Sequence, residues 1–101
     1  MSKHPEFDSG GYPTDNTLWE IENWNPRDPW GLMDYVIEAW RWSDIMIEQE
    51  GREITLITGG WSGNESIVSS LRLNIIFWSM NLLQSRRGCK YWLEIKNVRD
   101  T

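Results

Sequence analysis

The sequence predicts an α+β fold, a small single-layer sheet of three to four strands packed on one long buried helix and a shorter second helix. Two observations predict it. Apolar residues recur at helical spacing after residue 62, and short runs of β-branched and aromatic residues flank that segment on both sides. A strand, a long helix and a further strand in succession imply a parallel pair joined by a right-handed crossover. The sheet is therefore expected to combine a hairpin with this parallel pair.

The length and the distribution of residue types predict one domain. A chain of 101 residues builds a single hydrophobic core. Residues 1–17 are rich in Pro, Gly, Asp and Asn, so we expect an irregular N-terminal arm there. Residues 18–97 are expected to form the compact domain, and residues 98–101 a loose tail.

The first half of the domain is expected to contain an edge strand, a helix and a hairpin. Residues 18–24 alternate apolar and acidic side chains, which predicts the strand. Asp28 followed by Pro29 is a helix start, and the helix is expected to run from about 29 to 42. Residues 43–49 alternate again and residues 53–58 are β-branched and apolar, a hairpin pattern with its turn at Glu50-Gly51. The alternative for residues 43–49 is a continuation of the helix.

The second half is expected to be dominated by the long helix. Ser62 and Glu65 have the spacing of a capping box at its start, and Arg86, Arg87 and Gly88 suit its C-terminal end. At about 1.5 Å per residue the helix is about 35 Å long, so one end overhangs the sheet. Residues 90–96 then predict the last strand. The apolar stripe comprises Ile67, Leu71, Ile75, Trp78 and Leu82, widened by Val68, Ile76, Met80 and Leu83 so that most of the helix is expected to be covered.

Tryptophan content and charge bear on function. The chain has eight tryptophans, which either fill a small core or, where exposed, anchor a partner. The net charge is −5, which argues against binding to duplex nucleic acid. Residues 1–50 hold eleven acids and three bases, whereas residues 51–101 hold four acids and seven bases. Either the two halves attract each other, or an acidic surface and a basic site face different partners.

Several classes of function find no support in the residues. One His and one Cys, His4 and Cys89, allow neither an intramolecular disulfide nor a zinc site, and no cofactor or metal is expected. Ser62 misses the Gly-x-Ser-x-Gly spacing of a nucleophile elbow, so no catalytic residue is assigned and an enzyme is not expected. The chain has no apolar run of membrane-spanning length and no apolar signal segment, so we expect a cytoplasmic protein that makes no membrane contact.

A glycine-bearing turn is the candidate ligand site. A turn between a strand and a helix N-terminus offers unpaired N–H groups and the positive helix pole, which favour phosphate or carboxylate. Trp61 could stack on a base, although the alternative is a plain sharp turn with Trp61 folded onto the core. Arg86 and Arg87 lie at the far helix end, where only a homodimer would bring them to this turn. The candidate residues are Gly59, Gly60, Trp61, Ser62, Gly63 and Asn64 in the turn, with Arg52, Arg72 or Lys90 as cations.

Residues 52–95 carry a resemblance to a known group of proteins. The run from Gly59 to Glu65, then Asn74 to Trp78, then Ser85 to Gly88 and Tyr91 resembles small uncharacterised proteins encoded by tailed bacteriophages and prophages. That family has no assigned reaction, so the resemblance transfers no catalytic residue. It implies a phage origin, and with it the host bacterial cytoplasm and a role as an accessory or counter-defence factor.

Two functions from different classes follow. In the first, a non-enzymatic phage accessory protein binds a host or phage protein and modulates or inhibits it, using its acidic N-terminal half and exposed tryptophans. In the second, the 59–65 turn sequesters a small phosphate-bearing or nucleotide-like molecule. The first predicts an apolar patch on the surface. The second requires an exposed Trp61 beside free N–H groups and a nearby Arg or Lys.

Overall fold

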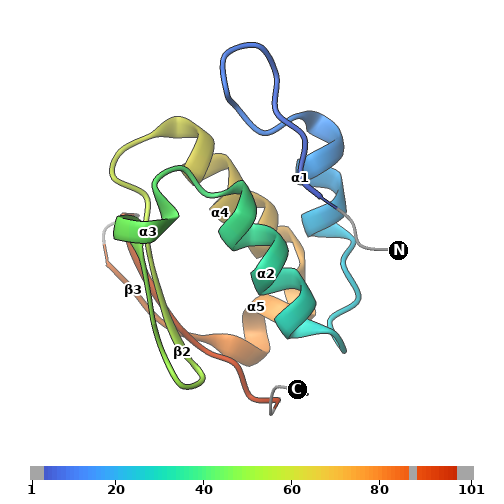
Figure 1. Cartoon of the computed structure of the whole chain (residues 1–101). Helices are drawn as coiled ribbons and strands as arrows, with labels where there is room; N and C mark the ends of the chain where they lie inside the picture. The colour runs from blue at the N-terminus through green and yellow to red at the C-terminus, as the bar shows by residue number, and fades with distance from the viewer. Residues whose placement is uncertain (1–3, 87–88, 98–101) are drawn as a thin grey trace.

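A computed structural model describes residues 4–86 and 89–97 and places one four-stranded sheet beside a layer of helices (Figure 1). The strands are ordered β1-β2-β4-β3, and all neighbouring pairs are antiparallel. The α+β class is therefore confirmed, whereas the predicted parallel pair is wrong. The elements are α1 (Asp15–Glu22), α2 (Pro29–Ala39), α3 (Ser43–Met46), β1 (Ile47–Glu50), β2 (Glu53–Ile57), α4 (Ser62–Leu73), α5 (Ile75–Asn81), β3 (Leu82–Arg86) and β4 (Lys90–Glu94).

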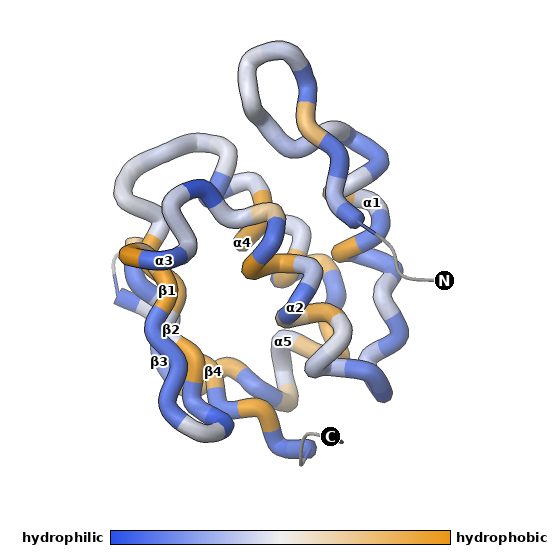
Figure 2. The backbone as a smooth tube through the Cα atoms, in the orientation of Figure 1, coloured by the Kyte–Doolittle hydropathy of each residue, from blue (hydrophilic) through white to orange (hydrophobic). Residues whose placement is uncertain are grey.

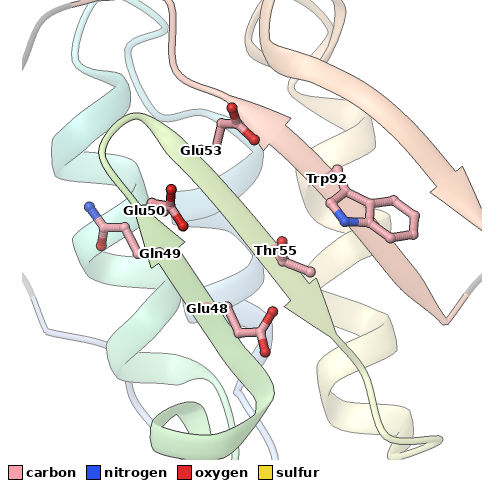
Figure 3. Close-up of a pocket in the computed structure, with 6 residues that line it drawn as sticks. All are labelled: Glu48, Gln49, Glu50, Glu53, Thr55 and Trp92. Carbon is pink, nitrogen blue, oxygen red and sulfur yellow. The ribbon is translucent and has the colours of Figure 1, made fainter.

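Only one face of the sheet is covered by helices. On that face Leu56 and Tyr91 are paired across β2 and β4, and both are buried with the neighbouring Ile54–Leu93 pair. The opposite, outer face carries Thr55 and Trp92, which are half-buried. Figure 3 views this face, with the helices behind the strands. In Figure 2 the β1–β2 hairpin is blue on both sides of a nearly white tip, consistent with its exposed position. The core therefore lies between one sheet face and the helices.

The segment predicted as an edge strand, residues 18–24, is mostly helix α1. Thr14 caps the helix by accepting a hydrogen bond from the Thr17 N–H, and Asp15 stands in the first turn, near the positive helix pole. Thr17 and Ile21, one turn apart, face the core. The alternation of Trp19 and Ile21 suggested a strand, but both residues lie inside a helix whose N-cap is Thr14. Trp19 ends up exposed on the outer side of the helix.

The helix predicted for residues 29–42 and the hairpin after it are confirmed, with one change at their junction. Asp28 accepts a hydrogen bond from the Gly31 N–H, and Pro29 occupies the first turn. The helix ends at Ala39, and the short helix α3 precedes β1. Gly51 has φ +60° in the hairpin turn, a conformation that glycine adopts without steric cost.

The single long helix predicted after residue 62 is wrong. Helix α4 ends at Leu73, α5 ends at Asn81, and residues 82–86 form a strand that pairs with β4. The break lies at Asn74, a buried residue whose side-chain Nδ2 donates to the carbonyls of Ile21 and Trp24. The amide thus ties the helix break to the end of α1. Arg86 lies in β3, and the predicted helix end at Arg87 and Gly88 falls outside the described residues.

The N-terminal arm, as far as it is described, is ordered by its own contacts. Asp8 Oδ1 accepts hydrogen bonds from the N–H groups of Gly10 and Tyr12, and Phe7 pairs with Pro13 in an isolated bridge. His4 contacts the Glu38 carboxylate of α2 at 2.9 Å. The last three residues of the predicted 1–17 arm already belong to α1. The predicted tail, 98–101, lies outside the described residues.

Candidate functional site

The predicted 59–65 turn is a sharp turn built from glycines and a buried asparagine. Gly59 and Gly60 have φ of +64° and +76°, values that favour glycine. Asn64 is fully buried; its Oδ1 accepts from the Arg41 N–H at 2.9 Å, and its Nδ2 donates to the Thr58 and Arg41 carbonyls. Asn64 is therefore a structural link between the turn and the segment after α2. Its side chain is not presented to a ligand.

The capping box predicted for Ser62 and Glu65 is wrong. Helix α4 begins one residue earlier than predicted, so that Ser62 is its first residue and Trp61 is the N-cap. The Glu65 N–H donates to the Trp61 carbonyl, which makes the first turn. A Trp side chain caps no N–H group, so the first N–H groups of α4 lack the side-chain acceptor expected at this position.

Trp61 is half-buried and belongs to a stack of aromatic and cationic side chains. Its ring stacks on Tyr12 from the arm, with centroids 4.9 Å apart and planes 20° from parallel. It also covers Gly63 closely enough to leave no room for a side chain there. The Arg41 guanidinium lies 4.9 Å from the Trp61 ring and 4.6 Å from the Trp42 ring. Much of the Trp61 surface that a base would stack on is thus already in contact with the protein.

Trp42 is the residue of this stack with the most unusual backbone. Its φ of 58° and ψ of 42° place it in the left-handed region, which costs a bulky residue roughly 1–2 kcal/mol. Its side chain is 50% exposed. The sequence signal that would have found this group is the Trp40-Arg41-Trp42 run, in which an Arg lies between two tryptophans. Trp40 itself is buried, with its indole N–H donating to the Ile57 carbonyl.

The three predicted cations are not gathered at the turn. Arg52 lies beyond the opposite end of β2 and donates to the Lys96 carbonyl. Arg72 is in the last turn of α4, where its guanidinium contacts the Tyr91 hydroxyl at 3.3 Å and lies over the Trp78 ring. Lys90 pairs with Ile57 at the end of β2 that leads into the turn, but its ammonium lies over the Trp92 ring, 5.1 Å from the ring centroid. The cation at the turn is Arg41.

The outer sheet face carries a shallow pocket of about 340 Å³ around Trp92 (Figure 3). Glu48, Thr55 and Trp92 form one cross-strand row from three neighbouring strands. Carboxylates surrounding an aromatic ring suit a cationic group and disfavour phosphate. Six residues line the pocket, namely Glu48, Gln49, Glu50, Glu53, Thr55 and Trp92.

A third feature is a group of exposed apolar side chains around α5, which we call the α5 surface. Its members belong to the end of α4, to α5 and to the start of β3, and Ile76 and Met80 lie one turn apart on α5. Ile75, Ile76, Met80 and Leu83 of this group were predicted to be covered within one long helix, but the break at Asn74 leaves them exposed. The α5 surface comprises Leu73, Ile75, Ile76, Met80 and Leu83, each between 45% and 69% exposed.

Other classes of site find little in the described part of the chain. There, no three His, Cys, Asp or Glu side chains are grouped as a metal site would need. Every buried side-chain nitrogen and oxygen of the described residues is hydrogen-bonded. None of the described helices has the length and apolar character needed to cross a membrane.

Comparisons with protein-family models, with curated proteins and with solved structures give no match to this chain. The phage origin expected for residues 52–95 stays a prediction.

Proposed function

We propose that this chain is a non-enzymatic, phage-encoded accessory protein that binds a host or phage protein in the bacterial cytoplasm and modulates or inhibits it. The observation that supports the proposal is the α5 surface, with Ile75 at 69% and Ile76 at 59% exposure. Covering one such side chain in a complex contributes about 1.5–3 kcal/mol. Neighbouring exposed apolar side chains are typical of protein–protein contact sites, whereas isolated ones are common on any surface.

The apolar residues of α5 are divided between the core and the surface. Phe77 is fully buried and Trp78 packs partly against the core, so α5 already has its anchoring contacts. Ile75, Ile76 and Met80 extend from the remaining sides. Since these side chains are not needed to hold α5 in place, their apolar character points to an intermolecular role.

Affinity capture with three purified baits tests the proposal. The first bait is the wild-type chain, and the second carries Ile75→Ser with Ile76→Ser. The third carries Ile45→Ser, a matched control on α3 because Ile45 is 67% exposed. Baits are incubated with bacterial lysate and retained proteins are identified by mass spectrometry.

We expect a partner that the wild-type chain and Ile45→Ser retain and the double variant loses. Calorimetry with the purified partner should then show at least about a tenfold weaker affinity for the double variant, since about 1.4 kcal/mol gives that factor. Recovery of the same proteins on all three baits would refute the role of the α5 surface.

The second candidate function is binding of a small phosphate-bearing or nucleotide-like molecule at the 59–65 turn. The observation that favours it is Arg41, whose guanidinium lies between the Trp61 and Trp42 rings beside the start of α4. A phosphate there would meet a guanidinium and the positive helix pole.

Titration calorimetry with inorganic phosphate and a panel of nucleotides tests this second function. Binding is expected to be lost in Arg41→Ala, in Trp61→Ala and in Gly60→Val. The matched control is Arg27→Ala, an exposed Arg in the turn before α2. Absence of heat for every nucleotide at millimolar concentration would exclude nucleotide sequestration at the turn.

A further inference from the structure

The β1 edge of the sheet is regular, and within the described residues no strand pairs with its outer side. The order β1-β2-β4-β3 places β1 at one edge and β3 at the other. β1 pairs with β2 in an unbroken register from Ile47 to Glu50, and its last three residues are exposed. The β3 edge has a register shift between Leu82 and Gln84, which interrupts its row of N–H and C=O groups. Of the two edges, β1 is therefore the one that suits an added strand.

β1 and β2 present glutamates on the outer sheet face, the one turned away from the helices (Figure 3). Glu48 pairs with Thr55 on this face. Glu50 pairs with Glu53, and Glu53 pairs in turn with Glu94 of β4, so three carboxylates form one cross-strand row. Like charges in directly opposite positions repel each other. The hairpin glutamates, as we call Glu48, Glu50 and Glu53, are thus an unfavourable group in the isolated chain.

The bases on the outer face lie away from β1. Lys96 is the ion-pair partner of Glu94. Arg86 and Lys90 pair with each other across β3 and β4. Lys90 pairs on its other side with Ile57, in the row beyond the start of β1. In the part of the chain that the structure describes, no ion pair includes a hairpin glutamate, so their charge is left for a partner.

We propose that the β1 edge binds an extended basic segment of a partner protein as an added strand. In such a strand every second side chain lies on the outer face, beside Glu48 and Glu50, and these side chains are Lys or Arg. The others lie on the helix side, beside the half-buried Ile47, and are apolar. Backbone hydrogen bonds supply affinity, and the alternation supplies specificity. The inference goes beyond the proposed function, because α5 leads into β3 at the opposite edge of the sheet.

Charge distinguishes a basic segment from the other occupants of this edge. The net charge of −5 attracts a basic segment before contact. A second copy joined edge to edge would bring Glu48 and Glu50 against the same residues of its image, which is repulsive. Charged side chains on an edge strand also discourage pairing with neutral strands.

Fluorescence anisotropy with labelled synthetic peptides tests the inference. The probe is a short peptide in which Lys alternates with Val, and the control peptide has the same composition with its lysines in one block. We expect the alternating peptide to bind more tightly, and Glu48→Gln with Glu50→Gln to weaken its binding about fivefold. Asp15→Asn with Glu65→Gln removes the same charge from exposed positions on α1 and α4 and should bind as wild type does. Raising the salt from about 0.05 M to about 0.5 M should reduce the difference between the two double variants.

Methylated peptides test whether the backbone of β1 takes part. N-methylation of every Lys, or of every Val, removes the N–H donors along one side of the extended peptide and leaves the other side intact. An added strand uses one side only, so one methylated peptide should lose binding and the other should keep it. In hydrogen–deuterium exchange, residues 47–50 should gain protection when the unmodified alternating peptide is bound.

The outcomes separate this inference from the proposed function. Ile75→Ser with Ile76→Ser should bind the alternating peptide as wild type does; loss of binding there would place the peptide on the α5 surface and overturn the inference. Equal binding of the alternating and block peptides, or of the two methylated peptides, would show only a general attraction of polycations and overturns it. Absence of binding, or binding that Glu48→Gln with Glu50→Gln leaves unchanged, also overturns it.

Two further outcomes would assign the edge to another occupant. Light scattering that shows a wild-type dimer, dissociated by the alternating peptide, would assign it to a second copy. Displacement of the peptide by spermine at comparable concentration would assign the glutamates to a small polyamine. Either result overturns the inference.

Discussion

At the scale of single residues, three buried asparagines join segments that are distant in the sequence. Asn64 connects the 59–65 turn to Arg41, and Asn74 connects the start of α5 to the end of α1. Asn81 donates to the Phe77 carbonyl and accepts from the Lys96 N–H, which connects α5 to the residues after β4. An amide side chain suits this position because it donates and accepts at once, so it can satisfy buried backbone groups that lack partners.

We expect Asn74→Ala to destabilise the fold by about 2–3 kcal/mol, because the carbonyls of Ile21 and Trp24 lose their donor in a buried position. Urea unfolding followed by far-UV circular dichroism measures the change. The matched substitution Asn23→Ala removes an exposed hydrogen bond to the Trp19 carbonyl and should stay within about 0.5 kcal/mol of wild type. Equal effects of the two substitutions would contradict the linking role of Asn74.

A second residue-scale prediction concerns Glu94. The hydrogen bond and charge of Lys96, whose Nζ is 2.6 Å from Glu94 Oε1, hold the pKa of Glu94 below its usual range, and Arg52 adds to this. Because the folded pKa is lowered, the associated stability is present above the unfolded pKa and is lost as pH falls through the folded pKa. NMR titration should show the low value in wild type and in Arg27→Met, and a higher one in Lys96→Met. An unchanged titration in Lys96→Met would show another cause.

At the scale of elements, the N-terminal arm is held to the body by a few contacts. The Tyr12–Trp61 stack joins its tip to the 59–65 turn, and the His4–Glu38 pair joins its start to α2. Thr17 Oγ1 also accepts from the Glu6 N–H at 2.7 Å. The arm thus touches three elements without entering the sheet.

Tyr12→Ala should raise hydrogen exchange in the arm while the sheet keeps its protection. The stack contributes about 0.5–1.5 kcal/mol beyond its buried area, so opening of residues 8–12 becomes roughly two- to tenfold more frequent. Hydrogen–deuterium exchange with mass spectrometry on arm peptides measures this. Tyr12→Phe keeps the ring and should behave as wild type. An arm that exchanges alike in all three chains would mean that the stack does not hold it.

At the scale of the whole molecule, stability and the proposed binding function rest on different residues. The core lies between one sheet face and the helices, whereas the α5 surface and the Trp92 pocket lie outside it. The two surfaces also differ in charge, since the pocket is lined by Glu48, Glu50 and Glu53, whereas the stretch that contains the α5 surface has no acidic residue between Glu65 and Glu94.

The same substitution in the core and on the α5 surface should have very different consequences. Ile67→Ala removes a fully buried side chain and should cost about 2–5 kcal/mol. Ile76→Ala truncates a side chain that is 59% exposed and should change the free energy of unfolding by no more than about 0.5 kcal/mol. Urea unfolding of both variants provides the comparison. A large loss in Ile76→Ala would mean that the α5 surface supports folding.

The sequence alone determined the features that depend on interactions between neighbours along the chain. The α+β class, the start of α2 at Asp28 and Pro29, and the β1–β2 hairpin follow from capping, proline geometry and alternation, all set by neighbours along the chain. It also predicted the 59–65 turn between strand and helix, but not the Arg41 that lies beside it.

Tertiary structure alone decided where the helix that carries the apolar stripe ends and which residues of the stripe are buried. The stripe from Ile67 to Leu83 has the same helical spacing throughout, yet the first helix ends at Asn74, where the side-chain amide donates to the carbonyls of Ile21 in α1 and of Trp24 just after it. Residues 82–86 become a strand because β4 supplies their backbone partners. Spacing along the chain records which residues share a helix face, but it carries no information on whether another element covers that face. For that reason the α5 surface emerged only from the fold.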